Sequence, residues 1–259
     1  MPPRSADLEL LVDAAAEAGR IALSRFRKNP DVWMKPGDSP VSDADLAVDT
    51  FLRDALLAAR PDYGWLSEET ADDPARLERA RTFVVDPIDG TRAFIEGRET
   101  WCVSVAVVEK GRAIAGVIDC PAKQEVFLAE AGGGAFRNGE RIFVRAVGGS
   151  PVVGGPKAML SALPSELRER VRHRGYIPSL AYRLAMVAEG TLDASFVKPH
   201  SHDWDIAAAD LVLAEAGGTL RDPQGMRPQI AGPEPRHGAL VAGHGPLLEA
   251  MTKVIAQAA

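Results

Sequence analysis

Cysteine is scarce in this sequence. Only Cys102 and Cys120 occur among 259 residues, and they do not form a CxxC pair. Neither a disulfide framework nor a thiolate zinc site is therefore expected. So few cysteines are typical of proteins from a reducing compartment.

An excess of positive charge is also absent. Thirty Lys and Arg against thirty-six Asp and Glu give a formal net charge of -6. The chain therefore lacks the net positive charge that would attract nucleic acid or an anionic membrane. Any anionic substrate must be bound by positive groups at its own site. We predict no nucleic-acid polymer and no membrane among the partners.

Long apolar runs are missing as well. No stretch reaches the roughly 18 apolar residues of a membrane span. Residues 1–10 carry Arg4, Asp7 and Glu9 in place of a signal peptide's apolar core, which predicts a cytoplasmic protein. The composition, 46% apolar and 25% charged, is that of a globular protein, and 259 residues fit one large domain or two coupled ones.

The first sixty residues have the apolar spacing of two amphipathic helices. One is predicted behind Ser5, as N-cap, and ahead of Pro30. The other is predicted to open near Ser42 and to close before Pro61. Asp45 can return a hydrogen bond to the Ser42 cap of the second helix, as in a capping box.

From residue 82 the pattern changes to short β-branched segments. Residues 82–86 and 101–109 are predicted to be strands, with hairpin turns at residues 110–112 and 137–140. The glycines at 132–134 predict a further turn, because no helical pattern follows them as it would in a phosphate-binding loop. We expect an antiparallel sheet beside the two helices.

A Gly/Pro-rich passage at residues 148–156 marks the expected division of the chain. We predict an N-terminal α+β half over residues 1–147 and a C-terminal α/β half over residues 148–259. In the second half, helices are expected over residues 179–189 and 205–216, with a strand over 193–198 between them.

Two aspartates follow a predicted apolar strand in Asp-Pro-Ile-Asp-Gly-Thr, residues 86–91. Proline and glycine fix a turn there, at the strand end where α/β proteins place their chemistry. The two carboxylates can converge on one hard divalent cation, and the N–H groups of Gly90 and Thr91 could receive a phosphate. An Asx-type turn stabilised by its own side chains is the structural alternative.

Further acids lie elsewhere in the chain. Glu68 and Glu69 follow a short apolar stretch, although adjacent acids are ordinarily solvated surface residues. Residues 200–205, His-Ser-His-Asp-Trp-Asp, have a pattern found at transition-metal sites, but no HExxH motif accompanies it and zinc is disfavoured. Asp205 heads a predicted helix, either as its N-cap or as a carboxylate directed toward Asp86 and Asp89.

Together these segments resemble the inositol monophosphatase family of magnesium-dependent, lithium-sensitive phosphatases. The resemblance is carried by residues 86–91 and by Trp-Asp-Ile-Ala-Ala-Ala-Asp at 204–210, with the Gly-Gly at 217–218. Residues 42–45 and 67–69 fall where the family has its upstream motifs. The resemblance covers essentially the whole chain and implies a layered α-β-α-β-α fold with metals held at the junction.

The resemblance also implies a ligand set for Mg²⁺. Glu68, Asp86 and the carbonyl of Ile88 would hold one ion, Asp86, Asp89 and Asp205 would hold a second, and a third, weaker ion would lie near Glu68. Two such ions can neutralise a phosphate dianion, activate water and stabilise the leaving alkoxide. Without them the clustered carboxylates would repel one another and raise some of their pKa values.

The remaining roles are implied in the same way. Asp45, Glu68 and Thr91 would be the catalytic residues, with Asp45 and Thr91 orienting the attacking water. The amides of Gly90 and Thr91 would bind the phosphate. Family members are commonly homodimers, so a homodimer is the expected assembly.

The contacts to the leaving group lie outside these motifs. Inositol-specific members carry an acid seven residues before the motif aspartate, where this chain has Lys198. Lys198, Arg183 and His202 could together meet a second phosphate, although single basic residues are ordinarily solvated.

Two further segments, at residues 35–42 and 66–69, are similar to the bacterial 3′(2′),5′-bisphosphate nucleotidase branch, with Ser42 in place of its usual threonine. We therefore expect a small phosphate monoester as substrate, with a bisphosphate nucleotide ahead of inositol monophosphate and histidinol phosphate third. A catalytically silent sugar-phosphate or metal sensor is the alternative outside catalysis.

Overall fold

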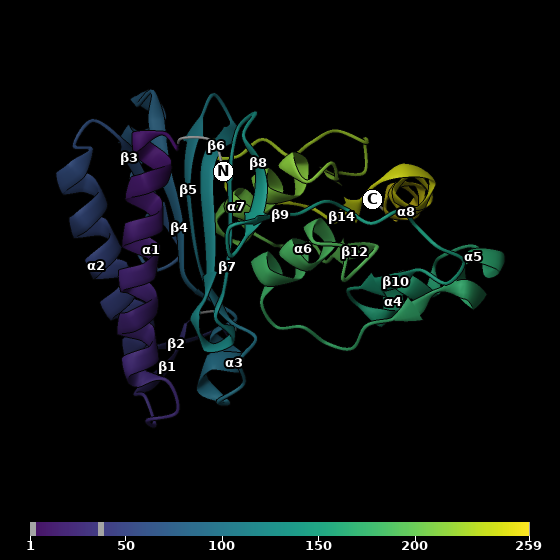
Figure 1. The fold of residues 1–259 in the computed structure, drawn as a ribbon, viewed down its shortest axis with the longest axis horizontal. Coiled ribbons are helices and arrows are strands. Elements are labelled where there is room, and N and C mark those ends of the chain that lie inside the picture. Colours follow the sequence, from purple (N-terminus) through teal and green to yellow (C-terminus); the bar gives the residue numbers. More distant parts are fainter. Residues whose placement is uncertain (1–3, 36–38, 259) are drawn as a thin grey trace.

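The computed structural model describes residues 4–35 and 39–258. Its elements stack in alternating layers of two helices, a large sheet, two further helices, a smaller sheet and an outer group of helices (Figure 1). The layered α-β-α-β-α arrangement that the family resemblance implied is confirmed. Residues 36–38, part of one segment compared with the nucleotidase branch, lie outside the described residues.

The larger sheet has seven strands in the order β3-β4-β5-β6-β7-β8-β9. These are β3 (Gly64–Ser67), β4 (Arg81–Asp89), β5 (Cys102–Glu109), β6 (Arg112–Cys120), β7 (Glu125–Glu130), β8 (Gly134–Arg137) and β9 (Glu140–Arg141). The sheet is antiparallel, as predicted, except that β3 runs parallel to β4. The turns predicted at 110–112, 132–134 and 137–140 are confirmed as the connections after β5, β7 and β8.

Helices α1 (Ala6–Arg25) and α2 (Asp43–Ala59) cover one face of this sheet (Figure 1). Their predicted caps are confirmed. The Ser5 side chain accepts a hydrogen bond from the Leu8 N–H, and Ser42 and Asp45 form a capping box. Fully buried residues such as Leu11 and Val48 place the apolar stripe of each helix against the strands. Two short 3₁₀ helices, η1 (Pro74–Glu78) and η2 (Pro121–Lys123), lie in connections of this half.

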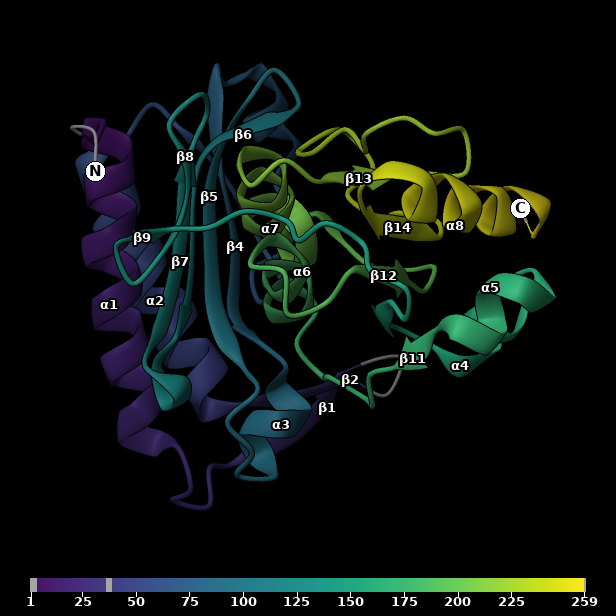
Figure 2. The ribbon, with the colours of Figure 1, turned by 45° about the vertical axis from the view of Figure 1, so that its right-hand side comes forward.

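Helices α6 (Leu180–Ala188) and α7 (Asp203–Glu215) form the layer between the two sheets (Figure 2). Residues 206–213 of α7 are all buried, as expected for a helix enclosed on several sides. A side-chain carbon added at Gly116 of β6 would lie 3.1 Å from the Cα of Ala208, so the glycine permits this close packing. The prediction that this helix starts at Asp205 was wrong by two residues.

The smaller sheet has five strands in the order β11-β10-β12-β14-β13. These are β10 (Val152–Gly154), β11 (Arg172–His173), β12 (Ala194–Val197), β13 (Thr219–Arg221) and β14 (Leu240–Gly243). The outer helices are α4 (Lys157–Ser161), α5 (Ser165–Arg170) and α8 (Gly245–Gln257), and residues of α8 share a buried apolar cluster with β10, β12 and β14.

The predicted division of the chain falls between the two sheets. The larger sheet ends at Arg141 and the smaller sheet begins at Val152. Independent halves over residues 1–147 and 148–259 stay a prediction. Within residues 4–35 and 39–258, every helix is too short or too polar to cross a membrane.

Candidate active site

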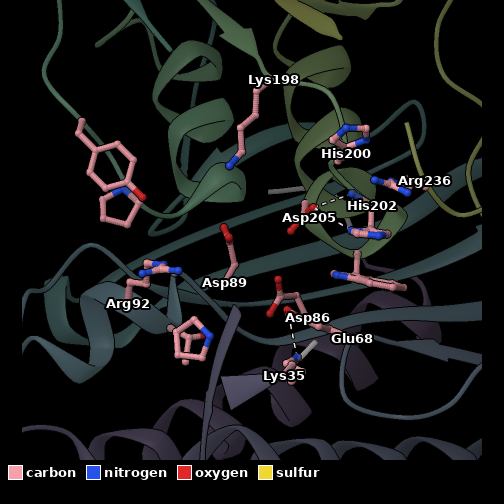
Figure 3. Close-up of a pocket in the computed structure, with 16 residues that line it drawn as sticks. Lys35, Glu68, Asp86, Asp89, Arg92, Lys198, His200, His202, Asp205 and Arg236 are labelled. Carbon is pink, nitrogen blue, oxygen red and sulfur yellow. Dashed lines mark hydrogen bonds and ion pairs between the residues drawn. The ribbon is translucent and has the colours of Figure 1, made fainter. Parts of the chain in front are cut away.

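A cavity of about 600 Å³ opens where the end of β4 meets the start of α7 (Figure 3). Its volume lies in the range of small-molecule sites, about 300 to 1,000 Å³. The side chains that line it form an acidic floor and a basic rim. The charged and histidine residues are Lys35, Glu68, Asp86, Asp89, Arg92, Lys198, His200, His202, Asp205 and Arg236.

An irregularity in β4 brings two aspartates to this cavity. In a regular strand Asp86 and Asp89 would face opposite sides of the sheet, because side chains alternate. Here Asp86 pairs with Ser104 and Asp89 with Cys102, so three steps along β4 match two along β5. The extra residue re-aims the chain, as bulges do near functional sites, and both carboxylates face the cavity (Figure 3).

Asp205 joins them from the first turn of α7. It is the third residue of the helix, and its carboxylate accepts a hydrogen bond of 2.6 Å from the backbone N–H of His202, the N-cap. The N-cap alternative for Asp205 is thus wrong, and the alternative of a carboxylate directed toward Asp86 and Asp89 is supported. One oxygen from each of Asp86, Asp89 and Asp205 lies within 4.8 Å of the others.

The carboxylate of Asp86 fits a metal ligand. Asp86 is 1% exposed, and its Oδ1 atom has no hydrogen-bond partner in the described part of the chain. Burial, followed by the negative charges of Glu68, Asp89 and Asp205, raises its pKa well above the ordinary value. An unpaired buried carboxylate oxygen is costly, and a divalent cation would satisfy it. These residues therefore fit a hard cation such as Mg²⁺.

Asp89 is held in place by the start of α6. Its carboxylate accepts hydrogen bonds from the Ser179 hydroxyl at 2.5 Å and from the backbone N–H groups of Leu180 at 3.1 Å and Ala181 at 2.6 Å. Burial raises the pKa of Asp89, while these hydrogen bonds oppose that shift. Ser179 was predicted only as the first residue of a helix, although a serine before an apolar helix is an N-cap signal.

Glu68 lines the same cavity but lies outside the three-carboxylate group. The Nζ atom of Lys35 contacts Glu68 at 2.9 Å and Glu69 at 2.7 Å, so these acids are not simply solvated. Asp49 of α2 supports this segment by accepting hydrogen bonds from the hydroxyls of Ser67 and Thr70. The contact with Lys35 was not predicted, because residues 35 and 68 are far apart in sequence.

Asp45, Thr91 and Ile88 form a connected set beside the carboxylates. The Thr91 hydroxyl lies 3.1 Å from Asp45 and 3.0 Å from the carbonyl of Ile88, which was predicted as a metal ligand. The Asp45 carboxylate also accepts two hydrogen bonds from Ser42. Burial raises the pKa of Asp45 to about 6, so the group is mostly ionised at neutral pH.

Gly90 makes the turn into helix α3 (Thr91–Ile95) possible. Its φ is +94°, and a side-chain carbon there would lie 3.0 Å from the carbonyl oxygen of Thr100 and 3.1 Å from Cβ of Ser179. Only glycine suits this position without strain. The N–H groups of Gly90 and Thr91 precede the first hydrogen bond within the helix, which leaves them for another acceptor.

Two of the three predicted substrate contacts line the cavity. Lys198 extends toward Asp89, and His202 lies beside Asp205 (Figure 3). The His202 ring stacks on Trp204 with centroids 4.5 Å apart, and burial lowers its pKa. Arg183 does not line this cavity but a neighbouring one. Arg92 and Arg236 complete the basic rim and were not singled out in the sequence.

Comparisons with known proteins identify the family of this chain. A family model described as the inositol monophosphatase family matches residues 4–258. A histidinol-phosphatase of Chlorobaculum parvum is 35% identical over 236 residues, covering 87% of this chain and 89% of that protein. An inositol-1-monophosphatase of Mesorhizobium japonicum is 35% identical over 265 residues, covering 97% of each chain. The solved structure of a Thermotoga maritima IMPase has a TM-score of 0.85 at 26% identity and covers 98% of both chains.

Proposed function

The chain belongs to the inositol monophosphatase family and is a phosphoric monoester hydrolase. On that premise, we propose that it depends on Mg²⁺ and acts on a phosphate monoester that carries a second anionic group. The observation that carries the metal requirement is the group formed by Asp86, Asp89 and Asp205. Its oxygens lie within 4.8 Å of one another, and one oxygen of Asp86 is buried without a partner.

The proposed metal ligands are those that the resemblance implied. Asp86, Asp89 and Asp205 would hold one ion, Asp86 with Glu68 and the Ile88 carbonyl another, and a third would bind near Glu68. Bound Mg²⁺ would neutralise the substrate phosphate and make water more acidic. Because Lys35 Nζ contacts Oε1 of Glu68, a metal ion bound by this carboxylate would compete with the ion pair.

The chain's own residues would position water and phosphate. Thr91 lies between Asp45 and the Ile88 carbonyl and would present its hydroxyl oxygen to the attacking water. Asp45, with a pKa of about 6, is mostly ionised at neutral pH and holds the Thr91 hydroxyl as donor. The N–H groups of Gly90 and Thr91 would donate to the substrate phosphate.

The basic rim supports an anionic leaving group. The acids that line the cavity are Glu68, Asp86, Asp89 and Asp205, and the proposed metals would engage all four. Among the residues that the structure describes, no lining carboxylate would then remain to bind the hydroxyls of an inositol ring. Lys198, which lines the cavity, would instead attract an anionic leaving group, and His202 would offer it a hydrogen bond.

Histidinol phosphate remains a second candidate because one relative of 35% identity is named for it. The test is kcat/KM of the purified protein with Mg²⁺ on 3′-phosphoadenosine 5′-phosphate, inositol 1-phosphate and histidinol phosphate. A preference above roughly tenfold, about 1.4 kcal/mol of transition-state binding, identifies the substrate class. No turnover of any of them would favour the silent sensor.

Two substitutions test the proposed mechanism in the same assay. Asp89→Asn and Asp205→Asn should each abolish turnover, because each removes a proposed metal ligand. A near-normal rate in either variant would remove that residue from the mechanism. A cytoplasmic location and a homodimer are proposed from the sequence and from the family, respectively.

A further inference from the structure

A second cavity of about 450 Å³ adjoins the active-site cavity. Tyr176 lines both of them. Three basic side chains, Lys157, His173 and Arg183, line the second cavity, and no acidic side chain of the described residues does. This space, here named the basic cavity, is lined by residues 155–157 that follow β10, by His173 of β11, by residues 175–177 and by Arg183 of α6.

Arg183 is a half-buried cation whose hydrogen bonds are incomplete. Its guanidinium has only two long contacts, 3.5 Å to the carbonyl of Ile177 and 3.4 Å to that of Phe196. The Nε atom is buried without a partner, and within residues 4–35 and 39–258 no carboxylate forms an ion pair with this arginine. A partly buried guanidinium with an unpaired Nε atom and no ion-pair partner favours an anion beside it.

Helix α6 links the basic cavity to the carboxylate cluster. The N–H of Ala181 donates to Asp89, and Arg183 follows two residues later. The negative charges of Asp89 and Asp205 reach Arg183 and oppose the lowering of its pKa by burial. Because Tyr176 lines both cavities, a substrate that extends past it can reach both of them.

We propose that the basic cavity binds a second phosphate group of the substrate while the first phosphate lies at the carboxylate cluster. Arg183 forms the floor of this subsite, and Lys157 and His173, both exposed, form its rim. This inference rests on the proposed phosphatase function and adds the location of the second anionic group. Histidinol phosphate, whose amine is cationic, would be repelled from this cavity.

The first test compares two substrates that differ only in the second phosphate, 3′-phosphoadenosine 5′-phosphate and adenosine 3′-phosphate. For Arg183→Gln and for Lys157→Gln, kcat/KM should fall about tenfold or more further on the bisphosphate than on the monophosphate. Lys157→Gln changes an exposed side chain and keeps the test valid if Arg183→Gln folds poorly. Arg174→Gln, an exposed neighbour that does not line the cavity, is the matched control and should leave the ratio unchanged.

The second test separates this inference from the proposed function. Without divalent metal, the carboxylate cluster repels anions, so adenosine 5′-phosphate should bind only through the basic cavity. In EDTA, calorimetric titration should detect binding of adenosine 5′-phosphate to the wild-type protein, and Lys157→Gln should weaken this binding several-fold. Adenosine, which lacks the phosphate, is the control ligand. Equal binding of the two ligands, or equal losses on both substrates in the first test, would overturn the subsite even if the enzyme is an active phosphatase. Binding in EDTA without turnover of any phosphate monoester would support the subsite and reject the proposed function.

Discussion

The effect of replacing Asp86 by Asn on stability should depend on metal. The variant should be more stable than wild type without metal and less stable with Mg²⁺. In the metal-free protein this carboxylate is 1% exposed and has an unpaired oxygen, and burial raises its pKa well above the ordinary value. The pKa of Asp86 is higher in the folded state than in the unfolded state, where it is about 3.9, so the protonated carboxyl group favours folding at low pH. This contribution is complete below pH 3.9 and is lost as the pH rises toward the pKa of the folded state. At pH 8 the wild-type protein therefore carries a penalty that asparagine removes.

The size of the effect follows from an unsatisfied buried polar group, which costs about 1 to 3 kcal/mol. In EDTA at pH 8, the free energy of unfolding of Asp86→Asn should exceed that of wild type by about this amount. Each kcal/mol corresponds to about 2 to 4 °C in Tm for a chain near this size. With Mg²⁺ at about 100 times its Kd, wild type should gain about 2.7 kcal/mol and the variant much less, so the order reverses for any penalty below about 2.7 kcal/mol.

Urea unfolding followed by tryptophan fluorescence measures both differences. The conditions are pH 8 with EDTA, pH 8 with Mg²⁺, and pH 4 with EDTA, where the two proteins should have similar stability. Asp54→Asn, an exposed acid on α2, is the control and should match wild type throughout. If Asp86→Asn is less stable than wild type in EDTA at pH 8, the carboxylate has a structural partner and the reasoning is refuted.

Three further predictions concern substrate choice, water positioning and pH-dependent stability. Lys198→Glu should lower kcat/KM at least about tenfold more on a bisphosphate nucleotide than on inositol 1-phosphate; equal losses would remove Lys198 from substrate recognition. Thr91→Ala should lower kcat by about 10²-fold with little change in KM, and an unchanged kcat would exclude the hydroxyl from catalysis. Asp119 is 7% exposed, burial raises its pKa to about 6, and its carboxylate has no hydrogen bond in the described part of the chain. Asp119→Asn should therefore raise the free energy of unfolding by up to about 3 kcal/mol at pH 8 and by little at pH 4, as measured by urea unfolding; no gain at pH 8 would contradict the shift.

The helices and strands could be predicted because their signals are local. The Ser5 and Ser42 caps and the turns that follow β5 and β8 depend on a few adjacent residues, and all of them are confirmed. The start of α7 was misplaced because His202 is the N-cap there. Histidine is not among the preferred N-caps, whereas Asp205 is of a preferred type.

The convergence of the carboxylates could not be worked out from spacing. Asp86 and Asp89 are three residues apart, and strand alternation alone would separate them. The irregular pairing of β4 with β5 places them together. The turn at residues 86–91 left convergence on a cation and an Asx-type turn as alternatives, and the family resemblance favoured convergence. For Arg183 the sequence was misleading. Its positive charge suggested a contact in the active-site cavity, but its position on α6 places it in the neighbouring cavity.

Metal binding by the purified protein is the most direct test of the carboxylate cluster. Free Mn²⁺, as a surrogate for Mg²⁺, can be titrated by electron paramagnetic resonance at pH 7.5 into wild type and Asp205→Asn. We predict saturable binding of at least two ions per chain in the wild-type protein and the loss or strong weakening of one in the variant. Absence of saturable binding, or an unchanged titration in Asp205→Asn, would contradict a metal site formed by these carboxylates.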